Sequence, residues 1–196
     1  MSAVSVLPCA WAPADDAVYR AYHDEEWGVP EYDSRALWEK LQLDGFQAGL
    51  SWRTILYKRN NFREEFENFQ PEKIALWTED RIEKALQNPG IIRSRSKINA
   101  LVGNAKAYLA FEQSGENFSD WLWAYVNRNP IIGNHAVFQD APTKTEISDR
   151  LSKDLKKRGF KFCGPTIVYA FMQAVGMVND HELSCPRFLE VQQHTR

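Results

Sequence analysis

Two pairs of cysteine and histidine stand at opposite ends of the chain and limit how it can fold. Cys9 and His23 lie near the start, and His181 and Cys185 form an H-x3-C pair near the end. Two thiolates and two imidazoles make a complete tetrahedral shell for zinc, which prefers sulfur and nitrogen donors. Such a zinc would be structural, because a filled shell leaves no position for water, and it would fasten the two chain ends together. The spacing alone leaves a second interpretation open, in which these are ordinary buried or surface residues.

The small number of cysteines supports a metal site over disulfides. Three cysteines in 196 residues are too few for a disulfide framework. We therefore expect a reducing, cytoplasmic location, where paired Cys and His more often bind metal. The other candidate ligands are Cys163, in an apolar turn and interpreted as packing, and His135, in a polar loop and interpreted as solvated. No membrane partner is expected, because no stretch approaches the roughly 18 to 20 apolar residues that span a bilayer and the start lacks signal-peptide features.

The periodicity of apolar residues predicts an all-α fold. From Ser96 onward they recur at steps of three and four, and Pro71, Thr78 and Ser119 are placed to begin further helices. Alternating strand patterns are nearly absent. We expect one helical unit over residues 1–196, as a single domain or as two small lobes that meet near the polar stretch 127–143. The patternless residues 188–196 are expected to form a disordered tail.

A helix, a tight turn and a second helix are predicted over residues 148–176. Gly159 can end the first helix in the left-handed conformation, and Pro165 can begin the second. The free N–H groups of that second helix can bind an anion. Basic side chains crowd the region, at Lys153, Lys156, Lys157, Arg158 and Lys161. Phosphate binding would explain this local charge in a chain of net charge −2, but a solvated basic helix end would explain it equally well. Arg93, Arg95 and Lys97 form a smaller cluster with the same two interpretations.

Aromatic residues gather in the first third of the chain, beside one carboxylate. Trp11, Tyr19 and Tyr22 lie close to Cys9 and His23 in the sequence, and the stretch 43–52 follows. In that stretch Asp44 is followed by Gly45 and Gly49, which predict a bend between helices, and then by Trp52. A carboxylate among aromatic rings suggests a pocket for a flat, electron-poor ligand, and plain core filling is the alternative.

Five longer motifs resemble those of the 3-methyladenine DNA glycosylase I family, a zinc-containing branch of the helix-hairpin-helix glycosylases. They occur in the family's order between residues 9 and 185, and they read Y-H-D-E-E-W-G-V-P, Q-A-G-L-S-W, G-I-I-R-S-R-S-K-I, K-K-R-G-F-K-F-C-G-P-T and V-N-D-H. The resemblance implies the helix-hairpin-helix DNA glycosylase fold, with its termini joined by one structural zinc ion. The family's zinc ligands fall on Cys9, His23, His181 and Cys185.

The resemblance also implies a base pocket and a DNA-binding surface. Tyr22 and Trp52 would sandwich an extruded base, with Trp11 and Tyr19 nearby, and Asp44 would accept a hydrogen bond from the base. The implied catalytic residues are Tyr22, Asp44 and Trp52. Phe46 is a further base-binding candidate. The implied DNA contacts are Gln47, Gly49 and Leu50, which would probe or wedge into the gap in the duplex, and Lys157, Gly159, Lys161, Gly164 and Thr166 of the hairpin.

The implied activity belongs to base-excision repair. A monomer would bind double-stranded alkylated DNA, flip out 3-methyladenine, hydrolyse its glycosidic bond and leave an abasic site with free 3-methyladenine as the product. No lyase activity is expected, because Thr166 stands approximately where bifunctional relatives carry a lysine.

The sequence departs from the family's usual pattern at the carboxylate. Asp44 replaces the usual glutamate and is one methylene shorter, so its hydrogen bond to the base would be longer or bridged by water. Phe46 replaces a polar residue of some relatives and could add stacking surface or belong to the core. Asp180 could support the sugar cation or orient a zinc ligand.

Two other functions remain open from the residues alone. One is a zinc-stabilised helical module that binds DNA without chemistry, and the other is a zinc hydrolase, which would need an open position on the metal.

Overall fold

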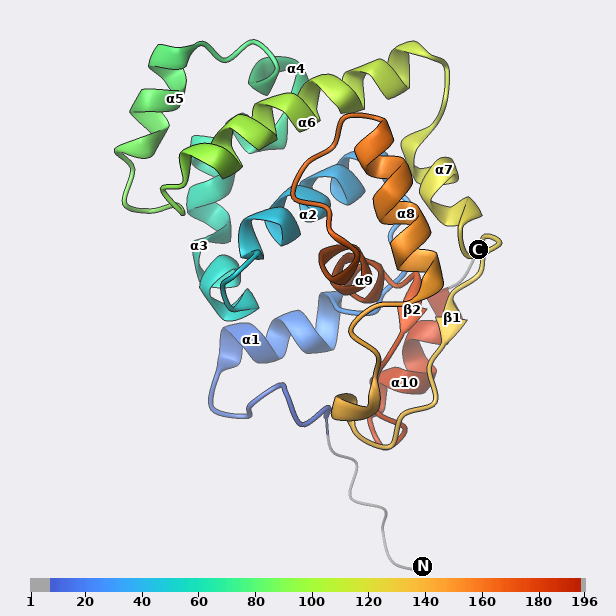
Figure 1. The fold of residues 1–196 in the computed structure, drawn as a ribbon. Helices are drawn as coiled ribbons and strands as arrows, with labels where there is room; N and C mark the ends of the chain where they lie inside the picture. Colours follow the sequence, from blue (N-terminus) through green and yellow to red (C-terminus); the bar gives the residue numbers. More distant parts are fainter. Residues whose placement is uncertain (1–7, 195–196) are drawn as a thin grey trace, which may run out of the picture.

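The computed structural model describes residues 8–194, and its architecture is helical, as the sequence predicts (Figure 1). Its longer α-helices are α2 (Ser34–Gln47), α3 (Trp52–Glu65), α5 (Glu79–Leu86), α6 (Arg95–Gln113), α8 (Glu146–Lys157) and α9 (Pro165–Ala174). The shorter helical segments are α1 (Ala17–Ala21), the π-helix η1 (Tyr22–Glu26), η2 (Glu67–Phe69), α4 (Pro71–Ile74), α7 (Phe118–Ala124), η3 (Phe138–Asp140), α10 (Arg187–Glu190) and η4 (Val191–His194). Two short strands, β1 (Ile131–Ile132) and β2 (Val178–Asn179), pair in parallel. None of the helices in this part of the chain is long and apolar enough to cross a membrane.

Helix α2 forms the centre of the fold and packs against α3, α6 and α9 (Figure 1). Asp33 begins it, because its carboxylate accepts hydrogen bonds from the first-turn amides of Arg35 and Ala36. The side chains of Leu37 and Trp38 are completely buried, and the Trp38 indole donates to the Phe69 carbonyl at 2.9 Å. Because several helices surround α2, the side chains on its buried face are held in fixed positions.

The predicted bend after Asp44 occurs, but at the second glycine rather than across both. Helix α2 continues through Gly45 to Gln47, and the chain turns at Gly49, whose φ is +77°. Gly45 serves a different purpose: a Cβ there would lie 3.4 Å from both the Cβ and the carbonyl oxygen of Phe162. The missing side chain therefore lets the turn between α8 and α9 approach the C-terminal half of α2.

Helices α8 and α9 lie where the sequence predicts two helices joined by a tight turn. Thr145 and Ser148 cap α8 reciprocally, and Gly159 follows its end with φ +94°. Asn104 of α6 holds the turn: its side chain accepts from the Lys161 amide at 2.7 Å and donates to the Lys161 carbonyl at 3.1 Å. Pro165 is the first residue of α9, as expected.

One predicted helix start is wrong by two residues. Asn117, not Ser119, caps α7, and its side chain accepts from the Asp120 amide at 2.9 Å. Ser119 lies inside the helix and is buried, where its own amide donates to the Ser34 hydroxyl of α2. Both residue types are good caps, and both residues contact Ser34 of α2, so the residue types alone do not decide where the helix begins.

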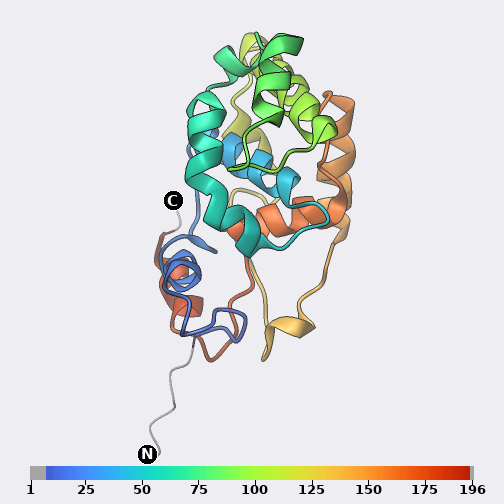
Figure 2. The same ribbon diagram turned by 90° about the vertical axis from the view of Figure 1, so that its left-hand side faces the viewer.

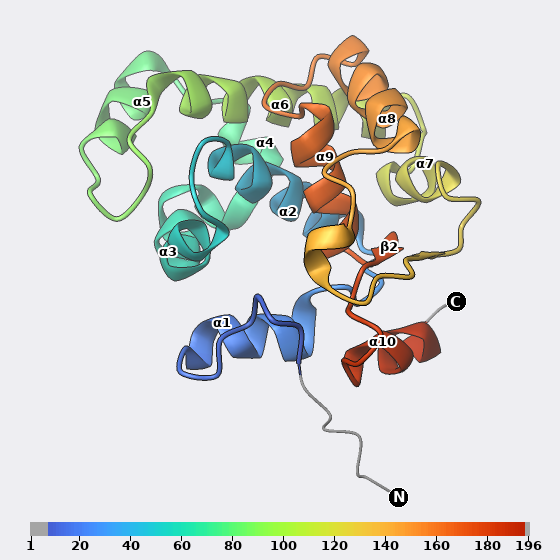
Figure 3. The same cartoon turned by 60° about the horizontal axis from the view of Figure 1, so that its bottom comes forward.

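The two ends of the described chain come together on one side of the helical body, where α1 and η1 lie beside α10 (Figures 2 and 3). The predicted disordered tail is wrong for residues 188–194, which form the end of α10 and the short helix η4. Val191 is 2% exposed, and the Phe188 carbonyl accepts from the Asn179 side chain at 2.9 Å. One apolar anchor and backbone contacts with β2 are enough to order this segment, and residues 195 and 196 of the predicted tail lie outside the described residues.

Candidate active site and metal centre

The four predicted metal ligands converge from both ends of the chain. Cys9, His23, His181 and Cys185 are all buried, and one ligand atom from each lies within 4.8 Å of the others. The Cys9 Sγ lies 3.4 Å from His181 Nδ1, and the Cys185 Sγ lies 3.6 Å from His23 Nε2 and 3.7 Å from His181 Nδ1. Tetrahedral zinc bonds would separate neighbouring sulfur and nitrogen ligands by about 3.6 Å. The donor set therefore has the size and chemistry of a four-ligand metal site.

The nitrogen of each histidine that faces away from this centre has its own partner. His181 Nε2 donates to the Trp27 carbonyl at 3.0 Å, and His23 Nδ1 lies 2.7 Å from a carboxylate oxygen of Asp24. Protons on these outer nitrogens leave a lone pair on each inner nitrogen, as metal ligation requires. Both imidazoles are therefore oriented and in the tautomer that binds a metal.

The thiols are also prepared for a metal. The hydrogen bond from Cys9, followed by the contacts with the His181 and His23 rings, holds the pKa of Cys185 well below its ordinary value, whereas bonding to Cys185 and burial raise the pKa of Cys9. The thiolate is the form of cysteine that ligates a metal, so metal binding would release the thiol protons. The residues fit a divalent metal held as a closed Cys2His2 shell.

A pocket of about 200 Å3 lies next to this centre, between α2, α3, α9 and the N-terminal segment. It is lined by Trp11, Tyr19, Tyr22, Trp27, Lys40, Asp44, Gln47, Trp52, Phe138, Ala170, Gln173 and Ala174. An engineered apolar cavity of about 150 Å3 holds benzene, so this volume is suited to a flat, base-sized ligand. Five of the predicted base-binding residues meet here: Trp11, Tyr19, Tyr22, Asp44 and Trp52.

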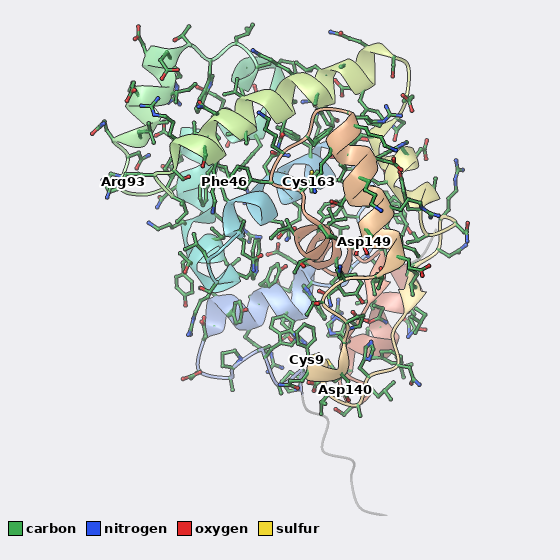
Figure 4. All side chains as sticks on the ribbon, in the orientation of Figure 1. Cys9, Phe46, Arg93, Asp140, Asp149 and Cys163 are labelled. Atoms are coloured by element: carbon green, nitrogen blue, oxygen red, sulfur yellow. The ribbon has the colours of Figure 1, made fainter. Side chains whose placement is uncertain are left out.

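The sixth predicted base-binding residue, Phe46, does not reach the pocket, and this prediction is wrong. Its ring packs 5.0 Å from Phe62 and 5.3 Å from Phe66, measured between ring centroids, and it is 2% exposed. Two positions beyond Asp44 on α2, its side chain projects from a different face of the helix. Figure 4 accordingly separates Phe46, beside the central helices, from Cys9, at the side where the chain ends meet.

Tyr22 and Trp52 touch each other across the pocket. Their ring centroids are 5.2 Å apart and their planes are tilted by 43°. A base between two rings needs a separation of about 7 Å, twice an ordinary stacking contact. The two rings must therefore part to enclose a base, or the base must stack against one of them. Burial, followed by the Asp44 carboxylate, raises the pKa of Tyr22 well above its ordinary value, so its hydroxyl stays neutral.

Asp44 is a buried residue of the pocket lining and forms an ion pair with Lys40, one helical turn earlier on α2. Burial raises the pKa of Asp44 and lowers that of Lys40, and each charge opposes the shift of the other. The Lys40 ammonium also lies 4.0 Å from the Trp52 ring centroid, a cation–π contact. Lys40 was not among the predicted site residues, although its spacing of four residues from Asp44 on one helix was a usable signal.

Three polar atoms of pocket residues lack a hydrogen-bond partner among residues 8–194. They are the second carboxylate oxygen of Asp44 and the indole nitrogens of Trp11 and Trp52. A buried polar group without a partner costs about 1–3 kcal/mol, so it is rare unless a ligand or water completes it. The pocket thus has one acceptor and two donors in an aromatic cavity.

The predicted DNA-contacting residues occupy two turns beside the pocket. Gln47 lines the pocket, and Leu50, after the Gly49 turn, is 41% exposed despite its apolar side chain. In the second turn Lys157 and Lys161 are exposed, and no side chain in the described part of the molecule caps the start of α9 at Gly164 and Thr166. Phe162 links the two turns through its contact with Gly45. The smaller basic cluster is partly used internally, because Arg95 pairs with Glu79 and Lys97 donates to the Ala48 carbonyl at the end of α2.

Asp180 is not part of the pocket lining and contacts neither metal-facing nitrogen. Its carboxylate accepts from the Tyr169 hydroxyl at 2.7 Å and from Gln173 at 2.8 Å, and it lies 3.3 Å from His135 Nε2. The residue therefore joins α9 to the loop before η3, and His135 is partly buried rather than fully solvated. Phe138, at the start of η3, was also not predicted; it packs against Trp11 and Trp27, and its sequence surroundings carry no signal for that contact.

Comparisons with known proteins show the family of the chain. Residues 11–188 match the model of the methyladenine glycosylase family. The DNA-3-methyladenine glycosylase of Haemophilus influenzae is 53% identical over 178 residues, which cover 91% of this chain and 96% of that protein. A crystal structure of 3-methyladenine DNA glycosylase I matches with a TM-score of 0.90 and 53% identity, covering 92% of this chain and 98% of that one. A variant of such an enzyme, solved in complex with 3-methyladenine, matches at 42% identity with a TM-score of 0.87, covering 91% and 95% of the two chains.

The fold and the site define the class of the protein: a helical enzyme with an aromatic pocket large enough for a nucleobase. The chain belongs to the methyladenine glycosylase family, and is a glycosylase.

Proposed function

We propose that this chain removes 3-methyladenine from alkylated double-stranded DNA and leaves an abasic site. Support comes from its family and from the similar enzyme that was solved with 3-methyladenine. The observation that carries the proposal is the unpaired carboxylate oxygen of Asp44, buried in a pocket with walls of Tyr22 and Trp52. An adenine offers the matching groups, an exocyclic amine to donate to the carboxylate and a flat face to stack on the rings.

The charge of the damaged base explains why this pocket suits it. Adenine methylated at N3 within DNA is cationic, and aromatic faces favour a desolvated cation by about 1–2 kcal/mol. An ionised Asp44 favours the same charge. Because aspartate is shorter than the family's usual glutamate, we infer that a water bridges part of the distance from Asp44 to the amine.

The bond-breaking step needs little acid catalysis. The bond between the sugar C1′ and N9 breaks with its electron pair going to the base, which becomes neutral. Water then forms a bond to C1′ and releases a proton to solvent. The positive charge of the methylated base has already weakened the C1′–N9 bond, so the residues act by capturing and orienting the base and by favouring its charge.

Access to the base requires that it leave the duplex, which costs a few kcal/mol. We infer that Leu50 enters the gap that the extruded base leaves and that Gln47 contacts the neighbouring bases, because Gln47 lines the pocket and Leu50, three residues later, is exposed. The amides at Gly164 and Thr166, with Lys157 and Lys161, would bind backbone phosphates. All these groups belong to one chain, which supports action as a monomer and as one helical unit. Thr166 cannot form a Schiff base, so the enzyme would be a hydrolase without lyase activity.

We propose that the metal is zinc, held by Cys9, His23, His181 and Cys185. Its four protein ligands would leave no position for water, so zinc would supply structure, fastening the segments that carry Trp11 and Tyr22. A reducing compartment such as the cytoplasm would keep both thiols available for the metal.

A base-release assay tests the proposal. The protein is incubated with duplex DNA treated with a methylating agent, and the released bases are separated by chromatography. We expect free 3-methyladenine and an equal amount of abasic sites, without strand cleavage. Binding to this DNA with no released base would instead favour a binding module. A parallel sample with Lys84→Ala, an exposed substitution on α5, should behave as the unchanged protein.

A further inference from the structure

Lys40 lies in the wall between two cavities. One is the base pocket already described, and the other is a neighbouring cavity of about 290 Å3 that Lys40, Tyr22 and Ala174 also line. The Lys40 side chain is 16% exposed. A long, flexible ammonium side chain in this position can be directed into either space without movement of α2.

In the structure, Lys40 contacts the two groups that a cationic base would contact, the Asp44 carboxylate and the Trp52 ring. Its ammonium forms the ion pair with Asp44, and it lies 4.0 Å from the centroid of the Trp52 ring. A base that stacks on this face of Trp52 and donates to Asp44 must displace the ammonium. Two cations in contact at the same carboxylate would repel each other inside a cavity of low dielectric.

The neighbouring cavity contains counter-charges that could receive Lys40. Its lining includes four glutamates, and its other cations are Arg59 and Arg63. Arg59 pairs with Glu26 and Arg63 pairs with Glu39. Glu25 and Glu31 remain without an arginine partner among the described residues, so the lining carries an excess of negative charge beside Lys40.

We propose that Lys40 is a specificity-determining residue that exchanges between these cavities, pairing with Asp44 when the pocket is empty and moving toward the glutamates when a cationic base enters. This inference rests on the proposed function of the pocket. Lys40 makes the empty pocket nearly neutral, so a cationic base gains entry only by replacing a resident cation. When the glycosidic bond breaks, the base becomes neutral, and Lys40 returns to Asp44 and favours release of the product.

Two small ligands that share the 3-methyladenine ring system and differ in charge and in one methyl group on N9 test the exchange. 3-Methyladenine is neutral at mildly alkaline pH, and 3,9-dimethyladeninium is a permanent cation that mimics the damaged nucleoside but has no sugar to lose. Their dissociation constants are measured by calorimetry for the metal-loaded protein and for Lys40→Gln, which keeps a hydrogen-bond donor but removes the charge. Lys40→Met, which also removes the donor, is the second variant, and Lys84→Gln is the matched control. Thermal unfolding is recorded for every variant.

We expect both Lys40 variants to bind the cation about tenfold more tightly and the neutral base also more tightly, but by less than about threefold, whereas Lys84→Gln changes neither. Slower product release should follow, measured as stronger inhibition of base excision by free 3-methyladenine. If both variants retain base excision and the ratio of the two affinities is unchanged, the proposed role of Lys40 is wrong and the proposed function of the pocket stands. If the unchanged protein binds neither ligand and releases no 3-methyladenine, the proposed function fails and this inference fails with it.

Discussion

The metal centre and the base pocket are neighbours built from some of the same segments, yet they differ in how completely their polar atoms are satisfied. At the metal centre four ligand atoms converge, and the outer nitrogens of His23 and His181 both have partners. In the pocket the second Asp44 oxygen and the Trp11 and Trp52 indoles find no partner among residues 8–194.

This difference separates structure from chemistry. A completed shell gains nothing from a further ligand, so its value lies in fastening the chain ends. An incomplete set of donors and acceptors within aromatic walls is stabilised only when a ligand supplies the missing partners. Trp11 and Tyr22 adjoin Cys9 and His23 in the sequence, so the metal centre positions part of the pocket.

The largest expected effect is on stability, from breaking the metal shell. Cys185→Ala should lower the free energy of unfolding by several kcal/mol and abolish metal binding, since structural zinc can contribute on the order of 10 kcal/mol. Metal content and thermal unfolding measure this. Cys163→Ala, which removes the buried thiol outside the metal shell, is the control. It should lower the free energy of unfolding by about 1 kcal/mol and leave metal binding unchanged. An equal loss of unfolding free energy in the two variants would contradict a structural role of the metal.

The second expected effect is on activity without loss of metal. Trp52→Ala should reduce base release at least about 100-fold, because it removes one wall of the pocket, while metal content stays unchanged. Trp77→Ala replaces a tryptophan outside the pocket that stacks on Arg81, and it should leave base release unchanged. If Trp52→Ala loses the metal and the cooperative fold, Trp52 belongs to the core rather than to the pocket.

A smaller effect concerns pH. Burial raises the pKa of Asp44, with Lys40 opposing the shift, and capture of a cation needs the ionised carboxylate. Base release, measured as kcat/KM, should therefore be full above this raised pKa and fall as the pH drops through it. Asp44→Asn should lower kcat/KM about tenfold at neutral pH and remove this acid limb. An acid limb that persists unchanged in Asp44→Asn would assign it to another group.

The smallest effect concerns the hairpin. Replacing Lys157 and Lys161 together with alanine should reduce the slope of log binding constant against log salt by up to about 2, one for each lost phosphate contact. Binding of free 3-methyladenine should not change. Lys84→Ala is the control for loss of a distant surface charge. An unchanged slope would return the hairpin lysines to the interpretation of a solvated helix end.

Local signals in the sequence predicted much of the fold. Pro71, Thr78 and Pro165 begin helices by chemistry that acts within one turn, and the structure has α4, α5 and α9 there. The convergence of Cys9 and Cys185 was predicted for a different reason: two thiols and two imidazoles make a complete zinc shell, and the family resemblance places the zinc ligands on these residues.

Features that depend on tertiary packing could not be predicted in the same way. Ser119 and Asn117 are equally good caps by residue type, but the Asn117 side chain accepts from the Asp120 amide, whereas Ser119 is buried inside the helix. Phe46 and Asp44 are two residues apart on one helix, but neighbouring helices direct one into the core and the other into the pocket. The order of residues 188–194 depends on burial of Val191, which sequence periodicity does not reveal.

Replacing the metal tests most directly the claim that one region holds the molecule together and the other performs the chemistry. The protein is refolded with Co2+ or with Zn2+, and base release from methylated DNA is measured in a single turnover. A closed shell of Cys9, His23, His181 and Cys185 predicts equal rate constants, within about twofold, for samples that are fully folded and fully loaded. A rate constant that follows the identity of the metal would contradict this account and assign the chemistry to the metal centre.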